Sequence, residues 1–208
     1  MSRVQEIAVG ARRVAGEPAL ELRHGDAHLL FGLGPPAAAA SPERRAAAIL
    51  AELSPALHCV RWARQVHGAT VLDVAAGPGS GPVACVGDAD GLVTCDPGTA
   101  LLVWTADCVP VALIGPGAVA MVHAGWRGAA AGIVAVAVRR LAEWGMPPGQ
   151  LRAFLGPAVC GRHYQVGPEV IAALERAGVP AAGWRDGDRV DLRAFLAGQL
   201  AGVGVGGV

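Results

Sequence analysis

The chain has 208 residues and a net charge of +0, and 53% of its residues are hydrophobic against 16% charged. This length can bury a sizeable core as one domain, 1–208, and the composition excludes a disordered chain. The balanced charge offers no basic surface to nucleic acid or an anionic membrane, and the absence of lysine excludes Schiff-base and P-loop chemistry.

The cysteines favour a reducing, cytoplasmic setting. They are odd in number and include no Cys-x-x-Cys, at Cys59, Cys85, Cys95, Cys108 and Cys160. The first residues lack a signal-peptide pattern, and Gly115-Pro116-Gly117 interrupts the apolar run from 108 to 126. We therefore expect a protein without a membrane span.

For the N-terminal half, the sequence predicts several strands and one helix. Ser41 and Pro42 are the N-cap and first residue of a helix that extends to Leu53. Alternating or apolar runs predict strands at 4–9, 19–31, 58–66, 70–74, 91–95 and 100–105.

A β-hairpin around Gly115-Pro116-Gly117 is the stretch on which the chemistry depends. Folding it brings Cys108 and His123 together at its open end. A two-residue turn pairs them directly, and a three-residue turn shifts them by one position. A thiol beside an imidazole is a metal corner, a nucleophile–base pair, or a buried core pair.

Helices dominate the C-terminal half. We expect one long helix at 127–144, a strand at 151–155, and helices at 168–176 and 191–200. Strands outnumber helices and tight turns join several of them, which favours an α+β layered fold over a regular βαβ array.

Three side chains can meet at one point: His67, at a turn before Gly68, with Cys108 and His123. Two imidazoles and one thiolate form a recognised catalytic zinc set with a fourth position for water or substrate. Asp107 can orient one of these ligands. Arg127, at the start of the long helix, can bind a phosphate or carboxylate of a substrate.

The other histidines and cysteines have no partners in the sequence. We interpret His24, His28 and His58 as structural, and Cys59, Cys85 and Cys95 as small core residues. The motifs Gly-x-Ser-x-Gly, His-Glu-x-x-His and Pro-Cys-x-x-Cys are all absent.

Several segments between about 60 and 170 resemble, in order and spacing, a bacterial family variously called laccase-domain protein, polyphenol oxidase, peptidoglycan editing factor and purine nucleoside phosphorylase. The matching segments are Gln65-Val66-His67-Gly68, Asp90-Gly91-Leu92-Val93-Thr94, Thr105-Ala106-Asp107-Cys108-Val109-Pro110-Val111, His123-Ala124-Gly125-Trp126-Arg127-Gly128, Gly156-Pro157-Ala158-Val159-Cys160 and Tyr164-Gln165-Val166-Gly167.

The resemblance implies an α/β/β/α layered fold and one zinc held by His67, Cys108 and His123. It implies phosphorolysis of purine nucleosides, with adenosine deamination at the same site. Arg45 matches an arginine of the family's motif, and the resemblance makes it a substrate-binding residue beside Arg127.

Two departures from the family pattern stand out. Arg23-His24-Gly25-Asp26 and Phe31-Gly32-Leu33-Gly34 match the family's N-terminal motifs only in part, and the family's C-terminal strand with its aromatic-Ser-x-Arg-Arg motif has no counterpart before Val208. A sheet edge is then open to a partner chain, so an oligomer through the C-terminal edge is a further expectation.

Three alternatives remain open at this point. One is a metal-free hydrolase for peptidoglycan-precursor editing, with Cys108 as nucleophile and His123 as base. Another is a copper polyphenol oxidase, for which six histidines are few. The last is a binding protein that holds a nucleoside without turnover.

Overall fold

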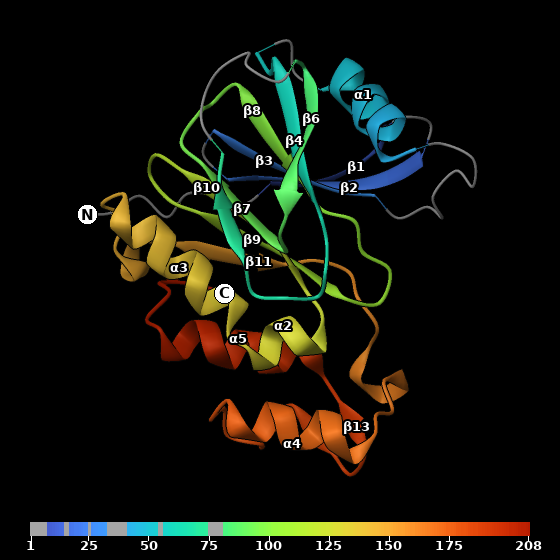
Figure 1. Ribbon diagram of the computed structural model, residues 1–208, viewed down its shortest axis with the longest axis vertical. Helices are drawn as coiled ribbons and strands as arrows, with labels where there is room; N and C mark the ends of the chain where they lie inside the picture. The colour runs from blue at the N-terminus through green and yellow to red at the C-terminus, as the bar shows by residue number, and fades with distance from the viewer. Residues whose placement is uncertain (1–7, 15–16, 25, 33–40, 54–55, 75–80) are drawn as a thin grey trace.

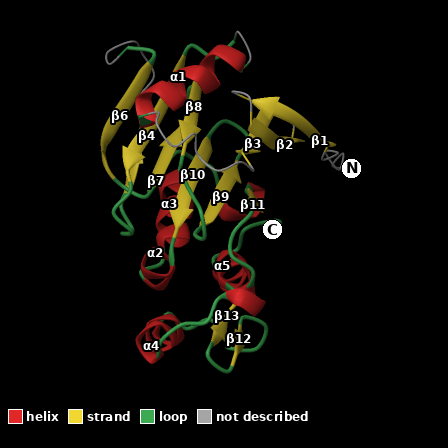
Figure 2. Cartoon of the chain, turned by 90° about the vertical axis from the view of Figure 1, so that its right-hand side faces the viewer, coloured by secondary structure: helices red, strands yellow, loops and turns green. Residues whose placement is uncertain are grey.

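The computed structural model describes residues 8–14, 17–24, 26–32, 41–53, 56–74 and 81–208, which form a layered arrangement of sheets and helices (Figures 1 and 2). The strands are β1 (Ala8–Val14), β2 (Glu17–His24), β3 (Ala27–Gly32), β4 (Cys59–Arg64), β5 (Val71–Asp73), β6 (Val83–Asp88), β7 (Gly91–Thr94), β8 (Thr99–Leu102), β9 (Val109–Ile114), β10 (Val119–Ala124), β11 (Arg152–Leu155), β12 (Arg185–Asp186) and β13 (Arg189–Val190). The helices are α1 (Pro42–Glu52), α2 (Trp126–Ala130), α3 (Ile133–Glu143), α4 (Pro168–Arg176) and α5 (Leu192–Gly202), with 3₁₀ turns η1 (Pro148–Gln150) and η2 (Gly161–His163).

Two sheets stacked between helices confirm the expected α/β/β/α layers. The central sheet has the strand order β11-β9-β10-β7-β5, and the second sheet has the order β6-β4-β8. Alternation along β7 places Val93 in the core shared with α2, α3 and α5, whereas Leu92 packs with Ala63 of β4 between the sheets. Helix α1 closes the far side of the second sheet, where Ala46 packs on Val60.

The N-terminal strands form a separate antiparallel sheet, β1-β2-β3. The single strand expected at 19–31 is wrong, because the chain turns at Asp26 and the two halves pair with each other. The strand expected at 4–9 lies outside the described residues up to position 7, and β1 runs from Ala8 to Val14.

Helix α1 begins as its sequence indicates. The Ser41 hydroxyl accepts a hydrogen bond from the Arg44 backbone N–H at 3.4 Å, and Pro42 occupies the first turn. The strand β6, from Val83 to Asp88, was not predicted; it pairs in parallel with β4.

The predicted hairpin is confirmed, but its register matches neither of the two expected ones. Ile114 pairs with Val119, so four residues form the connection and His123 lies opposite Pro110. This register moves Cys108 two positions from His123. A shift of two preserves the face of the sheet, so the pair still converges.

The single helix expected at 127–144 is wrong. Gly132 has φ +76°, a left-handed conformation that glycine tolerates and a continuous helix does not, so the chain divides into α2 and α3. The helix expected at 168–176 matches α4, and α5 begins after Asp191, whose carboxylate accepts from the Ala194 N–H at 3.0 Å.

The last residues of the chain run beside the edge strand β11. The Ala153 N–H donates to the Gly207 carbonyl at 2.8 Å, and the Gly206 N–H donates to the Leu151 carbonyl at 3.1 Å. These bonds occupy part of the edge on which an oligomer was expected. Among the described residues, none of the helices has the length and apolar character that crossing a membrane requires.

Candidate metal centre

Three potential metal ligands converge where the central sheet meets the second sheet. One ligand atom from each of His67, Cys108 and His123 lies within 4.8 Å of the other two. His67 comes from the β4–β5 loop, Cys108 directly precedes β9, and His123 is in β10. Their rings and thiol thus form a two-nitrogen, one-sulfur set that can hold a metal ion.

Asp90 organises this centre, although no sequence pattern predicts a role for it. Its carboxylate, fully buried, lies 2.8 Å from the Nδ1 atom of His123. The same carboxylate accepts hydrogen bonds from the backbone N–H groups of Val66, His67 and Gly68 at 3.2, 3.0 and 2.7 Å. One buried side chain therefore fixes two of the three potential ligands. With Nδ1 engaged, the His123 Nε2 atom is the one left for a metal.

The loop that carries His67 has an unusual backbone. His67 has φ 59°, the only positive φ of a non-glycine residue in the described part of the chain. Besides Asp90, the Gln65 side chain holds this loop, since its amide donates to the Trp104 carbonyl and accepts from the Trp104 N–H, both at 2.7 Å. The clamp joins the His67 loop to the segment that leads to Cys108.

Electrostatics favour a cation at this centre. Burial raises the pKa of the Cys108 thiol, and the negative charges of Asp107 and Asp90 raise it further. Burial lowers the pKa of His123, partly opposed by its bond to Asp90. The imidazole is then neutral, as metal binding requires, and the thiol lacks a positive partner that would stabilise its thiolate.

A cavity of about 510 Å³ opens beside the three ligands. Its walls include His67, Cys108 and His123 together with Trp62 and Trp104. This volume is within the range that holds small-molecule ligands. Trp104 also lines a larger hollow of about 2380 Å³ that reaches the N-terminal sheet; because that hollow lacks the three ligands, we assign the chemistry to the smaller one.

Gly125 leaves the space in which the ligands meet. A Cβ atom at this position would lie 3.0 Å from the Cys108 sulfur and 3.0 Å from the His67 Cδ2 atom. We predict that Gly125→Ala displaces both side chains and weakens metal binding about tenfold or more, a loss of about 1.4 kcal/mol. Zinc titration against a competing chelator measures the change.

Gly117→Ala is the matched control for this substitution. Gly117 belongs to the turn of the same hairpin, and a Cβ there would meet no atom within 4 Å. We expect its metal affinity to equal that of the wild type. An unchanged affinity in Gly125→Ala would show that the ligands do not need this space.

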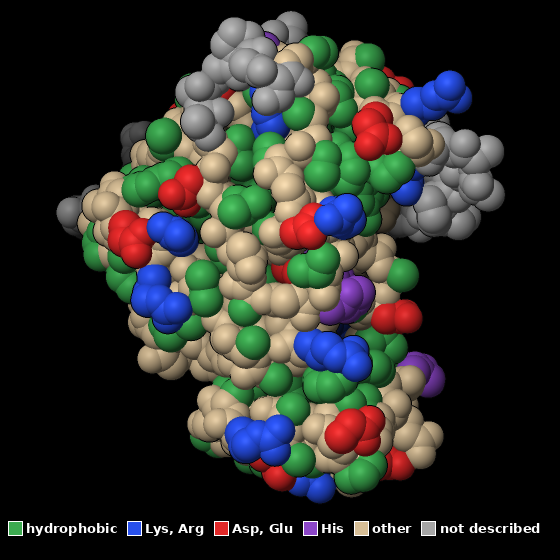
Figure 3. Space-filling view, in the orientation of Figure 1, with side chains coloured by type: hydrophobic (Ala, Val, Ile, Leu, Met, Phe, Trp, Pro, Cys, Tyr) green, Lys and Arg blue, Asp and Glu red, His purple; other side chains and the backbone are tan. Residues whose placement is uncertain are grey.

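The two arginines with expected substrate roles each stack on a tryptophan. Arg45, on α1, places its guanidinium 4.3 Å from the centre of the Trp104 ring, in the wall of the larger hollow. Arg127 is exposed on α2 and stacks on Trp126 at 4.2 Å. Because α2 has five residues and not eighteen, the long-helix dipole expected to support Arg127 is absent. In Figure 3 arginine and histidine side chains gather at the indentation above α4.

Asp107 is exposed and adjoins Cys108, whose pKa its charge helps to raise. Its backbone carbonyl accepts from the Val159 N–H at 3.1 Å, which holds the Cys160 segment against the centre. The orienting bond to a ligand comes from Asp90, and no hydrogen bond joins the Asp107 side chain to the three ligands in the described structure.

Cys160 forms a second thiol–imidazole pair. Its sulfur lies 2.9 Å from the His163 Nδ1 atom, and this hydrogen bond lowers the pKa of the Cys160 thiol. We predict that a limiting amount of iodoacetamide labels Cys160 before Cys108 in the metal-free protein, because the thiolate is the nucleophile. Mass spectrometry of the labelled peptides measures the order.

His163→Ala removes the partner and should move the pH profile of Cys160 labelling to higher pH, since the lowered pKa is then lost. If Cys108 reacts first in the wild type, the assignment of the two thiols is reversed. The order matters for any test of Cys108 as a nucleophile, because alkylation alone also reports on Cys160.

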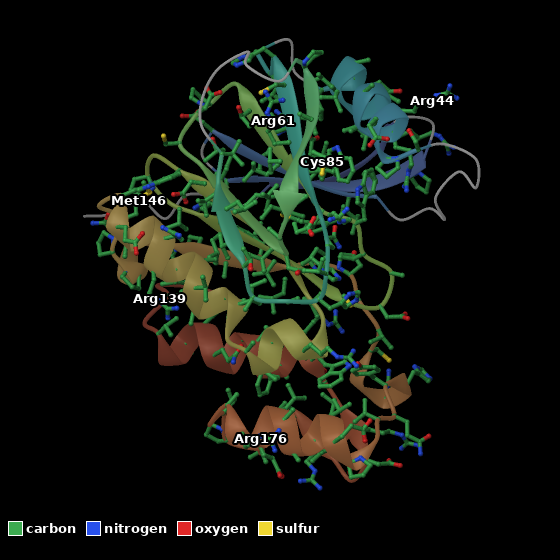
Figure 4. All side chains as sticks on the ribbon, in the orientation of Figure 1. Arg44, Arg61, Cys85, Arg139, Met146 and Arg176 are labelled. Atoms are coloured by element: carbon green, nitrogen blue, oxygen red, sulfur yellow. The ribbon has the colours of Figure 1, made fainter. Side chains whose placement is uncertain are left out.

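The remaining cysteines and histidines divide between core and surface. All five cysteines are free, and Cys59 is buried as expected. The expectation that Cys85 and Cys95 are core residues is wrong, because both are exposed, on β6 and at the end of β7; Figure 4 labels the first. His28 lies 3.8 Å from Glu21 and His58 lies 3.5 Å from Asp96.

Comparison with known proteins gives relatives over most of the chain. A purine nucleoside phosphorylase of Streptomyces coelicolor is 46% identical over 70% of this chain and 61% of its own length. One of Streptomyces griseus is 40% identical over 88% of this chain and 74% of its own length. The chain thus spans about three fifths of the first relative.

Solved structures agree with the fold. A Neisseria meningitidis protein superposes with a TM-score of 0.69 at 27% identity, covering 97% of this chain and 85% of its own. YlmD of Geobacillus stearothermophilus gives 0.62 at 33% identity, covering 70% of this chain and 59% of its own.

The family model described as multi-copper polyphenol oxidoreductase laccase matches residues 35–207, which include the three ligands, Asp90 and both substrate-binding candidates. This chain belongs to that family.

Proposed function

We propose that this protein is a zinc-dependent purine nucleoside phosphorylase that converts adenosine or inosine and phosphate to the free base and ribose 1-phosphate. The observation that carries the proposal is the convergence of His67, Cys108 and His123 on one cavity, with Asp90 behind them. The printed names of the relatives support the same activity. Adenosine deamination is a second reaction for the same cavity.

The donor set fits zinc. Two imidazole nitrogens and one thiolate are ligands of catalytic zinc sites, and a buried carboxylate behind one imidazole is the usual support for such a ligand. His67, Cys108 and His123 would hold the ion, which when bound supplies a Lewis acid for an oxygen of the substrate or of phosphate. In the metal-free centre, burial and the nearby charges of Asp107 and Asp90 favour the protonated Cys108 thiol.

The reaction needs phosphate and nucleoside held together. A phosphate oxygen forms a bond to the ribose C1′ atom as the bond from C1′ to the base nitrogen breaks, and the proton of the phosphate ends on the base. In our proposal Arg45 and Arg127 bind oxygens of phosphate or ribose, and Asp107 supports the centre. Both guanidiniums are fixed donors suited to phosphate. Trp62, which is buried, and Trp104, which is half-buried, give the cavity an aromatic wall.

The test is a phosphorolysis assay on zinc-loaded protein. Adenosine and inosine are each supplied with and without inorganic phosphate, and the free base, ribose 1-phosphate and inosine formed are quantified. We expect free base and ribose 1-phosphate only with phosphate present. Nucleoside that binds but is never cleaved, at any metal loading, would contradict the proposal and favour the binding-protein alternative.

Specific observations bear on the two alternative enzymes, the metal-free hydrolase and the copper polyphenol oxidase. A metal-free hydrolase needs a reactive Cys108 thiolate, and the raised pKa of that thiol weighs against it. A copper polyphenol oxidase follows from the family's description. Its test is elemental analysis for both metals together with a phenol-oxidation assay. We place the enzyme in the cytoplasm, which suits five free cysteines.

Arg45 provides a test of substrate binding. We predict that Arg45→Ala raises the KM for phosphate about tenfold or more with a smaller effect on kcat, because a charge-assisted hydrogen bond contributes about 1.5–3 kcal/mol. Steady-state kinetics with varied phosphate measures it. Arg139→Ala is the control, since Arg139 is exposed on α3 and lines neither of the two cavities. Equal KM values in both variants would remove Arg45 from the site.

A further inference from the structure

A second group of potential ligands lies at the beginning of β4, outside the centre described above. One ligand atom from each of His58, Cys59 and Asp96 lies within 4.8 Å of the other two. His58 and Cys59 enter β4, and Asp96 begins the turn between β7 and β8. The sequence alone predicts only a structural role for His58.

The turn that carries Asp96 is built to hold its carboxylate in place. One carboxylate oxygen accepts from the Gly98 N–H at 3.1 Å, and the other accepts from the Thr99 hydroxyl at 2.6 Å. The Gly98 carbonyl in turn accepts from the N–H groups of His58 at 2.9 Å and Cys59 at 3.3 Å. The two segments that supply the ligands are therefore fixed to each other by the backbone.

Gly98 creates the room for the imidazole. A Cβ atom at this position would lie 1.9 Å from the His58 Cε1 atom, so any side chain would displace the ring from the turn. With glycine there, the His58 Nε2 atom lies 3.5 Å from the nearer Asp96 oxygen. The Cys59 sulfur lies 3.0 Å from the Thr99 hydroxyl that also binds Asp96, which brings the thiol to the same point.

The separation of His58 and Asp96 matches one edge of a tetrahedral zinc site. Zinc binds imidazole nitrogen and carboxylate oxygen at about 2.0–2.2 Å, and two ligands at the tetrahedral angle are then about 3.4 Å apart. The nitrogen–oxygen distance of 3.5 Å agrees with that value. The hydrogen bonds from Thr99 and Gly98, with the charge of His58, lower the pKa of Asp96 and keep it ionised as a ligand must be.

We propose that His58, Cys59 and Asp96 form a second metal site, which binds Zn²⁺ with one imidazole, one thiolate and one carboxylate. The fourth position is open to solvent on the side of His58, whose side chain is 58% exposed, while Asp96 is 11% exposed. A thiolate and an imidazole select zinc over calcium and magnesium, which prefer oxygen ligands alone.

The position of this second site, at the beginning of β4 and β8, indicates a structural role for the metal. Cys59 and Thr99 are paired at the beginning of the parallel strands β4 and β8, whereas the Gln65–Trp104 clamp joins the same two segments beyond their ends. Along β4 the five steps from Cys59 to Arg64 span about 17 Å, so the second site is remote from His67. A metal bound there ties the two strands together at the end away from the cavity.

The experiment counts zinc per chain after equilibrium dialysis, for the wild type and single and double variants. We expect about two zinc ions in the wild type, about one in Cys59→Ser, in His58→Ala and in Cys108→Ala, and none in the Cys59→Ser/Cys108→Ala double variant. Cys95→Ser is the matched control, because this exposed thiol adjoins Asp96 without belonging to the ligand group; it should keep two.

The outcomes separate this proposal from the proposed function. Wild-type stoichiometry in both Cys59→Ser and His58→Ala overturns the second site, whatever happens at Cys108. A zinc count that falls in these variants and not in Cys108→Ala supports the second site and removes the first. Because His58 is exposed, its variant should fold even if Cys59→Ser does not, and circular dichroism of each variant identifies that case.

Discussion

Cys108→Ala is expected to remove zinc from the first centre and to abolish detectable phosphorolysis. The substitution leaves His67 and His123 as two ligands where catalytic zinc sites in proteins have three. It also removes the single ligand that is negative when bound, so none of the ion's charge is neutralised within the ligand set. Elemental analysis and the phosphorolysis assay on the same sample measure both losses.

Cys160→Ser is the control that distinguishes a ligand from a thiol near the cavity. Cys160 is half-buried, and its segment is hydrogen-bonded to Asp107 next to the centre. We expect this variant to retain the zinc of the first centre and most of the activity. Full turnover by a Cys108→Ala protein that has lost that zinc would contradict the zinc-dependent reaction. Retained zinc without turnover would instead move Cys108 from ligand to catalyst.

The hairpin illustrates how far the sequence predicts the site. Strand length and the Gly-Pro-Gly break locate both strands, and an even shift in register still brings Cys108 and His123 to the same face. The register was not predictable, because the Gly115 N–H donates to the Ala118 carbonyl and the turn is centred on Pro116 and Gly117, one position beyond the midpoint of Cys108 and His123. The convergence of Cys108 and His123 does not depend on this difference, since a shift of two positions leaves both side chains on the same face of the sheet.

Other features depend on contacts that no local pattern reports. The break at Gly132 follows from one left-handed residue inside an otherwise helical apolar run. Cys85 is exposed because β6 is an edge strand of the second sheet, and an edge leaves one side of a strand uncovered. The small, apolar character of cysteine favours a position in the core. Whether a given cysteine is exposed depends on the strands and helices that pack beside it.

Asp90 is the most consequential residue that the sequence analysis left without a role. Its contacts to His67 and His123 bridge 23 and 33 positions of the chain, so no spacing rule connects them. The sequence does contain one signal, which is an acidic residue directly before an apolar strand. A carboxylate is buried at such a position only when it accepts hydrogen bonds from nearby donors. Asp90 is hydrogen-bonded to both the His67 loop and the His123 ring.

Asp90→Asn is expected to destabilise the fold and weaken zinc binding together. The buried carboxylate accepts four hydrogen bonds, two at each oxygen. An asparagine replaces one carboxylate oxygen by an NH₂ group. The two N–H groups that donated to that oxygen then face another donor inside the protein. Each unsatisfied buried donor costs about 1–3 kcal/mol, which gives a loss of about 3 kcal/mol in the free energy of unfolding. Loss of the bond to His123 should lower zinc affinity about 10–100-fold.

Asp88→Asn is the matched control, because Asp88 lies two residues away with an exposed side chain and forms a surface ion pair with Arg64 at 2.6 Å. A surface pair contributes little to stability, so this variant should unfold and bind zinc like the wild type. Chemical denaturation of the metal-free proteins isolates the stability term, and zinc titration under native conditions isolates the affinity term. If Asp90→Asn lowers the free energy of unfolding but leaves zinc affinity unchanged, the role of Asp90 is only to hold the His67 loop. Loss of affinity at full stability would instead show that its bond to His123 is the contact on which the centre depends.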